Sequence, residues 1–431
     1  MKPSSLDIDR LRDVVRQLPN DALMPSREAA LAHLDEHGLP TLRDEDWKYT
    51  DLSPLVDISN RWLRAGGQQQ ATSDRYDGVE RVLSSIDATW FVISDGTIEQ
   101  LPAGSLRSGT IEVSRLSDAP APFVMGRPLA DLNAALRHDG LRIRITGQPE
   151  KPVGILLADR AGANAGVAQS CVEIELAPGA SAELIEYHLS DGDEDHYANS
   201  VLTMGIGDDA DVKHVRIQNR STRHVQTGRT SIALGRNATL RMASYDLGGG
   251  LIRNDIDIDL SQPGAHVSFD GLYLAGDGQH IDNHTRVDHR VGPSTSSQEY
   301  RGILNGKCRC VWNGKAIVHK GADGTDAKQA NHNLLLSEKA EIDAKPELEI
   351  YAEDVKCSHG TTVGQLDETA LFYLRSRGLD RNHATRVLTH AFAADLVRRV
   401  PVAAVTEAIT EIVETRLAEL TADDFIADIL S

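Results

Sequence analysis

The chain has 431 residues, enough for two or three domains or for one elongated body. Asp and Glu total 64 against 45 Lys and Arg, so the formal net charge is −19. A surface of that charge repels nucleic acids and anionic membranes, and neither is expected as a partner. Aromatic residues make up 4% of the chain, which favours a core of Val, Ile, Leu and Ala.

The first residues, "MKPSSLDIDRLRDVV", lack the apolar core of a signal peptide. Apolar runs such as "VGILLA" at 153–158 are too short to span a bilayer. We therefore expect a cytoplasmic protein whose four cysteines stay reduced. No C-x-x-C spacing occurs among them, which argues against a structural zinc site.

Residues 1–145 are predicted to form an N-terminal domain of helices and mixed structure. Leu11, Val14, Val15 and Leu18 follow a three-to-four spacing that gives one buried helical stripe. A second helix is expected to begin with Ser26 as its N-cap and to end at Gly38. Residues 64–75 are polar and indicate a loop. From residue 88 the period changes to two, as in strands, with one helix predicted at 127–140.

Residues 146–364 contain a weak internal repeat. It is visible in "LAPGASA", "IGDDADV" and "LGRNATL", with one insertion in "LSQPGAHV", and its alanines fall at positions 180, 210, 238 and 265. "LSEKAEI" (336–342) fits the same pattern. A tight turn restarted by a small side chain about every thirty residues is typical of stacked coils, so a parallel β-helix is favoured. A β-sandwich with irregular loops is the competing fold.

Residues 365–431 are predicted to form a C-terminal helical domain. Asp367 marks the start of its first helix, Gly378 ends that helix, and Asp380 caps the next. The second helix is expected to bury Val387, Leu388, Ala391, Phe392 and Leu396. Pro401 suits the first turn of a third helix, whose predicted stripe is Val405, Ile409, Ile412, Val413 and Leu420.

Several cysteines and histidines are candidates for chemistry. Cys308 and Cys310 can form a soft-metal site, or they can be small apolar residues of the repeat, with Cys308 in the alanine position. Cys171 is expected in the core. "HIDNHTRVDH" holds three histidines and two aspartates within residues 280–289, which can bind a metal or hydrogen-bond neighbouring coils. No phosphate loop, nucleophile elbow or H-E-x-x-H motif occurs, which argues against an enzyme that works alone.

Cys357 and His359 lie two residues apart in "EDVKCSHGTT", where the β region gives way to helices. If the backbone is extended, both side chains lie on one side of it. A thiol and an imidazole are good iron ligands, but two ligands do not complete a coordination sphere, so a metal here needs ligands from another chain. The alternative is that both residues stabilise the turn.

At these residues the chain resembles the SufB/SufD family of iron–sulfur cluster assembly scaffold proteins. The segment "NHNLLLSEKAEIDAKPELEIYAEDVKCSHGTTVGQLDETALFYLRSRGL" is similar to the family's most characteristic block. "RDEDWKYTDLSPL", "HIDNHTRVDH", "YRGILNGK" and "GKAIVHKGADGTDAKQ" also match it, and the helical N-terminal region is similar to the SufD branch. "CRC" at 308–310 departs from the family pattern.

The resemblance implies a right-handed parallel β-helix flanked by helices. It implies a non-catalytic scaffold subunit that pairs with SufB through the β-helices and recruits the SufC ATPase through its C-terminal helices. His359, together with Cys357, would hold iron or a nascent iron–sulfur cluster shared with SufB. The cluster is not expected to stay on the isolated chain, and that chain can form a homodimer. The alternatives are a SufB-like scaffold that binds a cluster by itself and a β-helix carbohydrate-active enzyme.

Overall fold

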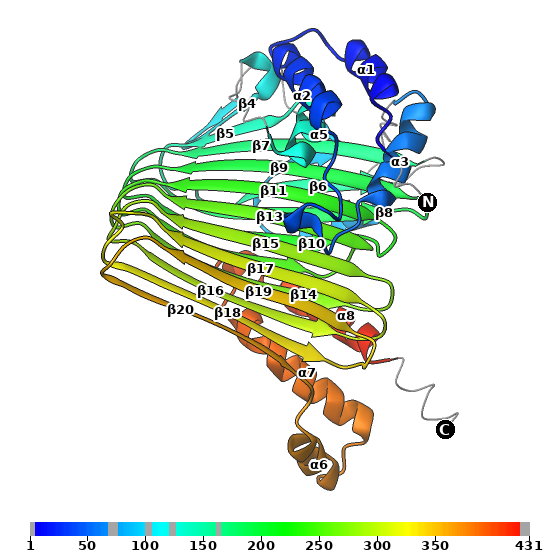
Figure 1. The fold of residues 1–431 in the computed structure, drawn as a ribbon, viewed down its shortest axis with the longest axis vertical. Coiled ribbons are helices and arrows are strands. Elements are labelled where there is room, and N and C mark those ends of the chain that lie inside the picture. The colour runs from blue at the N-terminus through cyan, green and yellow to red at the C-terminus, as the bar shows by residue number, and fades with distance from the viewer. Residues whose placement is uncertain (1–4, 68–75, 100–105, 120–125, 161–164, 423–431) are drawn as a thin grey trace.

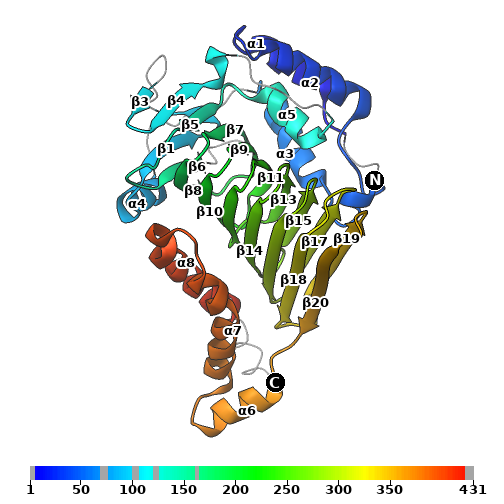
Figure 2. The same ribbon diagram turned by 90° about the vertical axis from the view of Figure 1, so that its left-hand side faces the viewer.

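The structure is a computed structural model that describes residues 5–67, 76–99, 106–119, 126–160 and 165–422. Two ten-stranded sheets face each other and form the body of the molecule, with helices on both outer sides (Figures 1 and 2). The first sheet, sheet A, contains in spatial order β2 (Thr97–Ile98), β1 (Thr89–Ser94), β6 (Val153–Arg160), β8 (Ser181–Asp191), β10 (Asp211–Asn219), β12 (Thr239–Asp246), β14 (His266–Ala275), β16 (Thr295–Leu304), β18 (Thr325–Leu335) and β20 (Val355–Gly364).

The second sheet, sheet B, faces sheet A, and in both sheets the strands follow one another from the N-terminal end of the molecule to the C-terminal end. It contains β3 (Leu106–Ser108), β4 (Ile111–Arg115), β5 (Leu141–Ile145), β7 (Gly166–Leu176), β9 (His196–Ile206), β11 (Val225–Leu234), β13 (Leu251–Leu260), β15 (His280–His289), β17 (Arg309–Val318) and β19 (Glu341–Ile350). The predicted helix near residue 130 is present as α5 (Pro128–Leu136), and the strands expected between residues 88 and 145 are β1, β2, β4 and β5.

From β6 onward the chain alternates between the sheets, so each sheet A strand and the following sheet B strand form one coil. Within each sheet, successive strands of this region pair in parallel, as β8 does with β10 and β9 with β11. The inward-facing aliphatic side chains of both sheets form one continuous core between them. The predicted parallel β-solenoid is therefore confirmed, and the competing sandwich is wrong.

The repeat alanines stack at the edge where the chain passes from sheet B to sheet A. Ala180, Ala210, Ala238 and Ala265 are all buried, and the carbonyl of each accepts a backbone hydrogen bond from the next coil at 2.9–3.0 Å. The side chain must be small there because the next coil lies directly beside it. Cys308 and Ala340, which the sequence places in the same repeat, lie at the opposite edge, where sheet A passes to sheet B. One turn pattern therefore serves both edges.

An N-terminal group of helices covers the outer face of sheet B. It comprises α1 (Ile8–Gln17), α2 (Met24–His37), α3 (Ser53–Arg64) and α5. Leu11, Leu55 and Trp62 pack in one cluster with Val167 and Tyr197 of the sheet. The predicted stripe of α1 is buried as expected. The predicted start of α2 is wrong, because the helix begins at Met24 and the Ser26 hydroxyl donates to the Leu23 carbonyl.

A second group of helices covers the outer face of sheet A (Figure 2). It comprises α4 (Asp77–Ser85), α7 (Arg381–Arg398) and α8 (Thr406–Leu420), and α6 (Glu368–Ser376) projects beyond the sheet. Asp380 caps α7 as predicted, and Asp367, the predicted start of the first helix, is the N-cap of α6. Pro401 is not in a helix, since α8 starts at Thr406 after a short 3₁₀ turn at Ala403–Val405. No helix within the described residues has both the length and the apolar character needed to cross a membrane.

Enlarging one stacked alanine tests the packing of the turns. We expect Ala238→Leu to lower the free energy of unfolding by about 1–3 kcal/mol, because extra methylenes in a close-packed site force neighbouring coils apart. Ala233→Leu is the matched control, because Ala233 is exposed in the preceding strand β11. The midpoint of urea denaturation measures both. Equal midpoints for the two variants would contradict the stacked-turn packing.

Candidate functional site

The two ends of the solenoid differ. At the N-terminal end, each sheet finishes in short antiparallel strands, β2 with two residues and β3 with three. At the C-terminal end, β19 and β20 each have ten residues, and each pairs with one neighbour only. Short strands limit unwanted pairing at a sheet edge, whereas long ones offer a full row of free N–H and C=O groups. The C-terminal end therefore presents two long strand edges that no other described strand pairs with.

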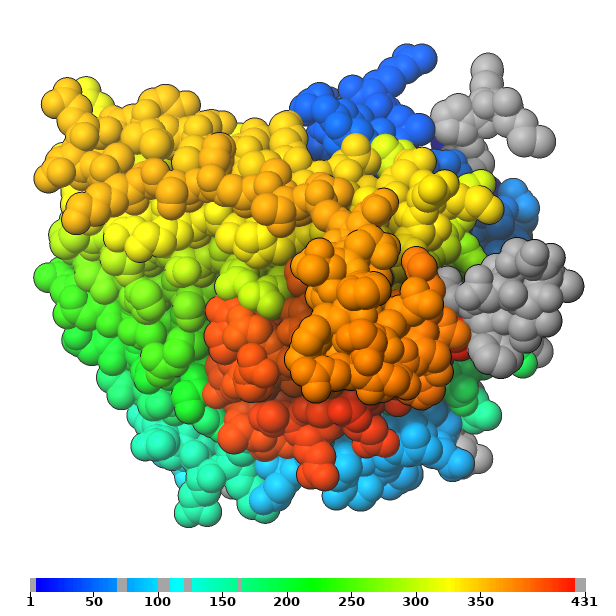
Figure 3. Space-filling view, turned by 90° about the horizontal axis from the view of Figure 1, so that it is seen from below, coloured from blue at the N-terminus to red at the C-terminus, as the bar shows by residue number. Residues whose placement is uncertain are grey.

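The side chains at this end continue the inside of the solenoid. On β18, Ala327 and Gln329 are buried inside, and their partners on β20 are Cys357 and His359. Cys357 is half-buried and His359 is exposed, because among the described residues no further coil covers them. The yellow and orange strands lie open along one side of Figure 3, with α6 in front of part of them. We call β19 and β20 together the open end.

Cys357 and His359 share one side of β20, as the sequence predicts for an extended backbone. His359 makes no hydrogen bond or ion pair with any other described residue, so its imidazole is available to a ligand or to a partner. Burial raises the pKa of the Cys357 thiol. The thiol is therefore protonated near neutral pH, and a bound metal would have to displace its proton.

A thiolate and an imidazole are two of the ligands that an iron centre needs. Within the described residues, no third His, Cys, Asp or Glu joins Cys357 and His359 in a cluster with metal-ligand geometry. Two side chains do not complete a coordination sphere, so a metal at the open end would need further ligands from another chain. The alternative role, stabilising a turn, does not fit the position of both residues within a regular strand.

The histidine-rich strand β15 does not gather its polar residues at one point. Asp282 faces outward and pairs with Arg253 at 2.5 Å and with His284 at 3.1 Å, while the Thr50 hydroxyl also donates to it. His289 faces the interior, where its two ring nitrogens contact the Ser294 and Ser296 hydroxyls at 2.8 Å. The predicted inter-coil bonding is present, and Asp282 also holds the N-terminal segment to sheet B.

The three remaining cysteines are buried. Cys308 and Cys310 are both buried, and Cys310 packs in the core between the sheets. Cys171 is buried under the N-terminal helices, where the Arg137 guanidinium donates to its sulfur at 3.0 Å. The core prediction for Cys171 is confirmed.

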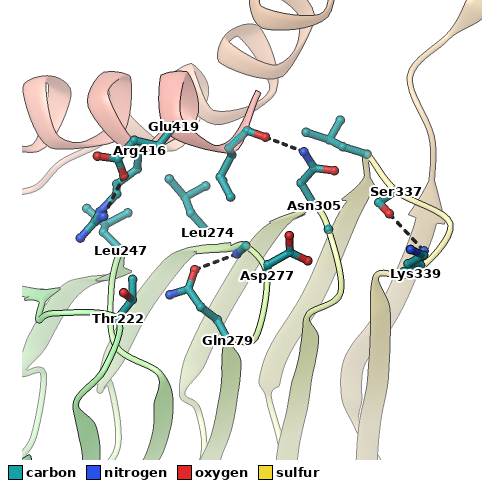
Figure 4. A pocket seen from close by; sticks show the side chains of 14 residues that line it. Thr222, Leu247, Leu274, Asp277, Gln279, Asn305, Ser337, Lys339, Arg416 and Glu419 are labelled. Atoms are coloured by element: carbon teal, nitrogen blue, oxygen red, sulfur yellow. Dashed lines mark hydrogen bonds and ion pairs between the residues drawn. The ribbon is translucent and has the colours of Figure 1, made fainter. Parts of the chain in front are cut away.

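A cavity of about 500 Å³ lies between the end of α8 and the turns from sheet A to sheet B (Figure 4). Arg416 pairs with Glu419 at 2.8 Å, Asn305 donates to the Leu420 carbonyl at 2.5 Å, and Gln279 accepts from the Gly276 amide at 2.8 Å. These polar groups satisfy one another rather than converging on a common point. The cavity therefore lacks the convergent polar groups that fix a small ligand.

The predicted apolar stripe of α7 is partly covered: Leu396 is buried as predicted, Leu388 and Phe392 are half-buried, and Val387 and Ala391 are exposed. Val387 is 48% exposed, and the residues that the helix does bury are Ala384, Thr385, Thr389, Ala393, Leu396 and Val397. On the neighbouring α6, Phe372 is 73% exposed and Tyr373 is also exposed. The stripe was predicted to be core because helical spacing identifies an apolar face without saying what covers it. We call Phe372, Tyr373 and Val387 the α6–α7 apolar surface.

Sequence reasoning missed one group of residues completely. Asp95, Asp159 and His196 each offer one ligand atom, and these atoms lie within 4.8 Å of one another. The three residues are scattered over a hundred positions and form no motif. Only the pairing of β1 with β6, and the turn from sheet A to sheet B, bring them together.

Comparisons with known proteins identify a family. Residues 159–392 match the family model described as SUF system FeS cluster assembly, SufBD core domain. The chain is 30% identical to the iron–sulfur cluster assembly protein SufD of Escherichia coli over 86% of this chain and 88% of that protein. It is 27% identical to an iron–sulfur cluster assembly SufBD family protein of Synechocystis over 91% of each. Identity to SufD of Bacillus subtilis is 28% over 55% of each chain.

The exposure of the four cysteines predicts selective alkylation. With iodoacetamide on the native chain, we expect modification at Cys357 only, because Cys171, Cys308 and Cys310 are buried. Its rate should keep rising above about pH 8.5, since the thiolate is the reactive form and the pKa of this thiol is raised. Peptide mass spectrometry locates the label. In urea all four cysteines should react, and equal native labelling of a second cysteine would contradict the burial.

Proposed function

The chain belongs to the SufBD family of the SUF iron–sulfur cluster assembly system, and on that premise we propose that it is a SufD-type scaffold subunit. In this role it contributes His359 and Cys357 to a site shared with a SufB-type partner, where a nascent cluster is assembled as cargo. The observation that carries the proposal is the open end, where both residues sit on a ten-residue edge strand with its outer side unpaired.

The open end supports pairing with another β-solenoid. Strand addition to a free edge supplies main-chain hydrogen bonds, and the side chains on alternate positions give specificity. Inward-facing Ile342, Leu348 and Ile350 on β19 and Val363 on β20 are only partly covered, and a following coil would bury them. A second copy of this chain presents the same strands, so the open end also offers the isolated chain a route to a homodimer.

The chemistry at this site follows from its residues. Cys357 must lose its proton to bind iron or a cluster, and His359 binds through a neutral ring nitrogen. Neither residue needs to turn over a substrate, and the chain acts by positioning ligands at the edge of a rigid sheet. The partner supplies the remaining ligands, so the cluster is held by the complex and not by this chain alone.

The α6–α7 apolar surface supports recruitment of a SufC-type ATPase. A phosphate loop is absent from the sequence, so nucleotide hydrolysis would belong to the partner. Phe372 and Tyr373 lie on α6, which projects beyond the sheet, and Val387 is an exposed residue of α7. Exposed aromatic and aliphatic side chains of this kind mark protein contacts.

Replacing the imidazole tests the shared site. We expect His359→Ala to leave the melting temperature unchanged, because the side chain is exposed, yet to abolish maturation of iron–sulfur enzymes in cells that depend on this system. His332→Ala is the control, since His332 lies on the outward face of the neighbouring β18. Enzyme maturation equal to wild type in the His359 variant would refute the site.

Isolation of the chain tests the alternative of a SufB-like scaffold. Under the proposal, anaerobic reconstitution with iron and sulfide gives the isolated chain no stable cluster, because only half of the ligands are present. Absorbance after gel filtration measures retention. A cluster retained on the isolated monomer would favour the SufB-like alternative.

Charging the α6–α7 apolar surface tests the ATPase contact. We expect the double change Phe372→Asp and Val387→Asp to abolish co-purification with a SufC-type partner while the SufB-type partner is retained. Thr415→Asp adds a charge to the exposed side of α8 and should preserve both contacts. Retention of the ATPase by the double variant would place its binding elsewhere.

A further inference from the structure

Three titratable side chains converge at the end of the solenoid opposite to the open end. Asp95 lies in the turn between β1 and β2, Asp159 lies near the end of β6, and His196 begins β9. One ligand atom from each lies within 4.8 Å of the other two, and the His196 Nε2 atom is 3.7 Å from Asp95 Oδ1. The three residues come from both sheets, so tertiary structure alone assembles the group.

The backbone holds each member in place. Parallel pairing of β1 with β6 continues into the turn, where the Asp95 amide donates to the Ala158 carbonyl and the Arg160 amide donates to Asp95 Oδ1. The His196 ring lies over Gly166 of the adjacent strand β7, and a Cβ atom there would stand 2.5 Å from the ring Cδ2 atom. The absence of a side chain at residue 166 therefore leaves the space that this imidazole occupies.

The group is buried and holds two carboxylates, Asp95 and Asp159, beside one arginine and one histidine. Asp95 is 8% exposed, Asp159 2% and His196 1%. Arg220 pairs with one Asp159 oxygen at 2.5 Å, whereas the nearest ion-pair partner of Asp95 among the described residues is the His196 imidazole, at 3.7 Å. A buried charge is costly unless it is paired, protonated or bound to a metal.

Two atoms of the group also lack partners. Asp159 Oδ1 and His196 Nδ1 are buried, and neither forms a hydrogen bond with a described residue. The nearby His224 is not free in this way, because its nitrogens contact the Ser190 hydroxyl at 2.6 Å and the Glu194 carbonyl at 3.1 Å. Buried polar atoms in proteins are nearly always satisfied, so this carboxylate oxygen calls for a water molecule or a cation as its partner, and the ligand atoms around it favour the cation.

We propose that Asp95, Asp159 and His196 form a binding site for one divalent transition-metal ion of the Zn²⁺ type. Carboxylate oxygen and imidazole nitrogen bind Zn²⁺ at roughly 2.0–2.2 Å, so two ligands of one ion lie no more than about 4.4 Å apart. The separation of His196 from Asp95 already meets this limit. An imidazole ligand favours first-row transition metals over Mg²⁺ and Ca²⁺, and a water molecule can fill the fourth position.

An ion at this position has a structural role that is independent of cluster assembly. It ties the β1–β2 turn and β6 of sheet A to β9 of sheet B, and it neutralises carboxylate charge. Because it binds the folded state, it raises the thermal stability of the chain in proportion to the logarithm of its free concentration. The competing explanation is a purely structural ion pair between Asp159 and Arg220, which would require no metal.

The test uses the full chain without an affinity tag, in a parent carrying Cys357→Ser and His359→Ala. Removal of these two residues prevents metal binding at the open end, so failure of the proposed cluster site does not affect the result. Zn²⁺ is titrated against a chromophoric chelator, and Co²⁺ reports coordination through its visible absorption. We expect the parent to bind one equivalent tightly and to melt at a higher temperature with Zn²⁺.

Single substitutions assign the ligands. Asp159→Asn and His196→Ala should each lose the bound equivalent, the Co²⁺ spectrum and the Zn²⁺-dependent rise in melting temperature. Asp193→Asn is the matched control, because this exposed aspartate lies in the same turn before β9 and should change none of the three. Asp95→Asn leaves the Asp159–Arg220 pair intact, so it should retain the wild-type circular dichroism yet still lose the ion.

Two results would overturn the proposal. One is a parent that binds no Zn²⁺ and gives no Co²⁺ spectrum, which would leave the ion pair as the whole function of the group. The other is a folded Asp95→Asn or His196→Ala variant that still binds one equivalent, which would place the ion elsewhere. If Asp159→Asn does not fold, these two variants decide the outcome.

Discussion

Every coil of this protein depends on the backbone hydrogen bonds that its two strands make with the coils on either side. A parallel ladder has no natural end, because each strand leaves a row of donors and acceptors for the next. The chain resolves this at its first coils by turning into short antiparallel strands, β2 and β3. It does not resolve it after β19 and β20. This difference between the two ends explains why His359 is exposed. Its strand, β20, is the last of sheet A, so no further described coil covers its imidazole.

The interior of the solenoid is divided along its strands. Toward the alanine edge the inward side chains are aliphatic, as with Leu184 and Val212, and they form the continuous core. Toward the opposite edge they become polar or charged, and Arg216 pairs there with Asp246 at 2.9 Å and with Asn254 at 2.7 Å. A buried charge without its partner is strongly destabilising, so these pairs fix the register of successive coils. The group around Asp159 lies on this polar side as well. It differs because two carboxylates, Asp95 and Asp159, stand beside one arginine, Arg220.

The sequence predicts the solenoid because its constraint is local. A tight turn beside a neighbouring coil requires a small residue, and the alanines at 180, 210, 238 and 265 meet that requirement in sequence order. The same turn pattern occurs at both edges of the solenoid. The sequence therefore places Cys308 and Ala340 in one repeat with these alanines, although they lie at the opposite edge. Helix capping was equally readable at Asp367 and Asp380, whose side chains accept from nearby backbone amides. Ser26 was misassigned because a hydroxyl can also bond inside the first turn.

The sequence predicts that Cys357 and His359 lie on one side of a strand, but it does not predict how exposed they are. Cys357 and His359 are two residues apart in a strand, so their common side follows from the period of two. Their exposure depends on where the ladder ends, and the uncovered side of α7 depends on what the rest of the chain fails to bury.

The sequence by itself determined the coiled strands, the helical ends and the pairing of a thiol with an imidazole, because turn size, apolar spacing and strand period act over a few residues. The tertiary structure alone decided which edge stays open and which distant groups meet. Asp95, Asp159 and His196 converge because strands of two sheets are stacked in register, and no spacing along the chain encodes that proximity.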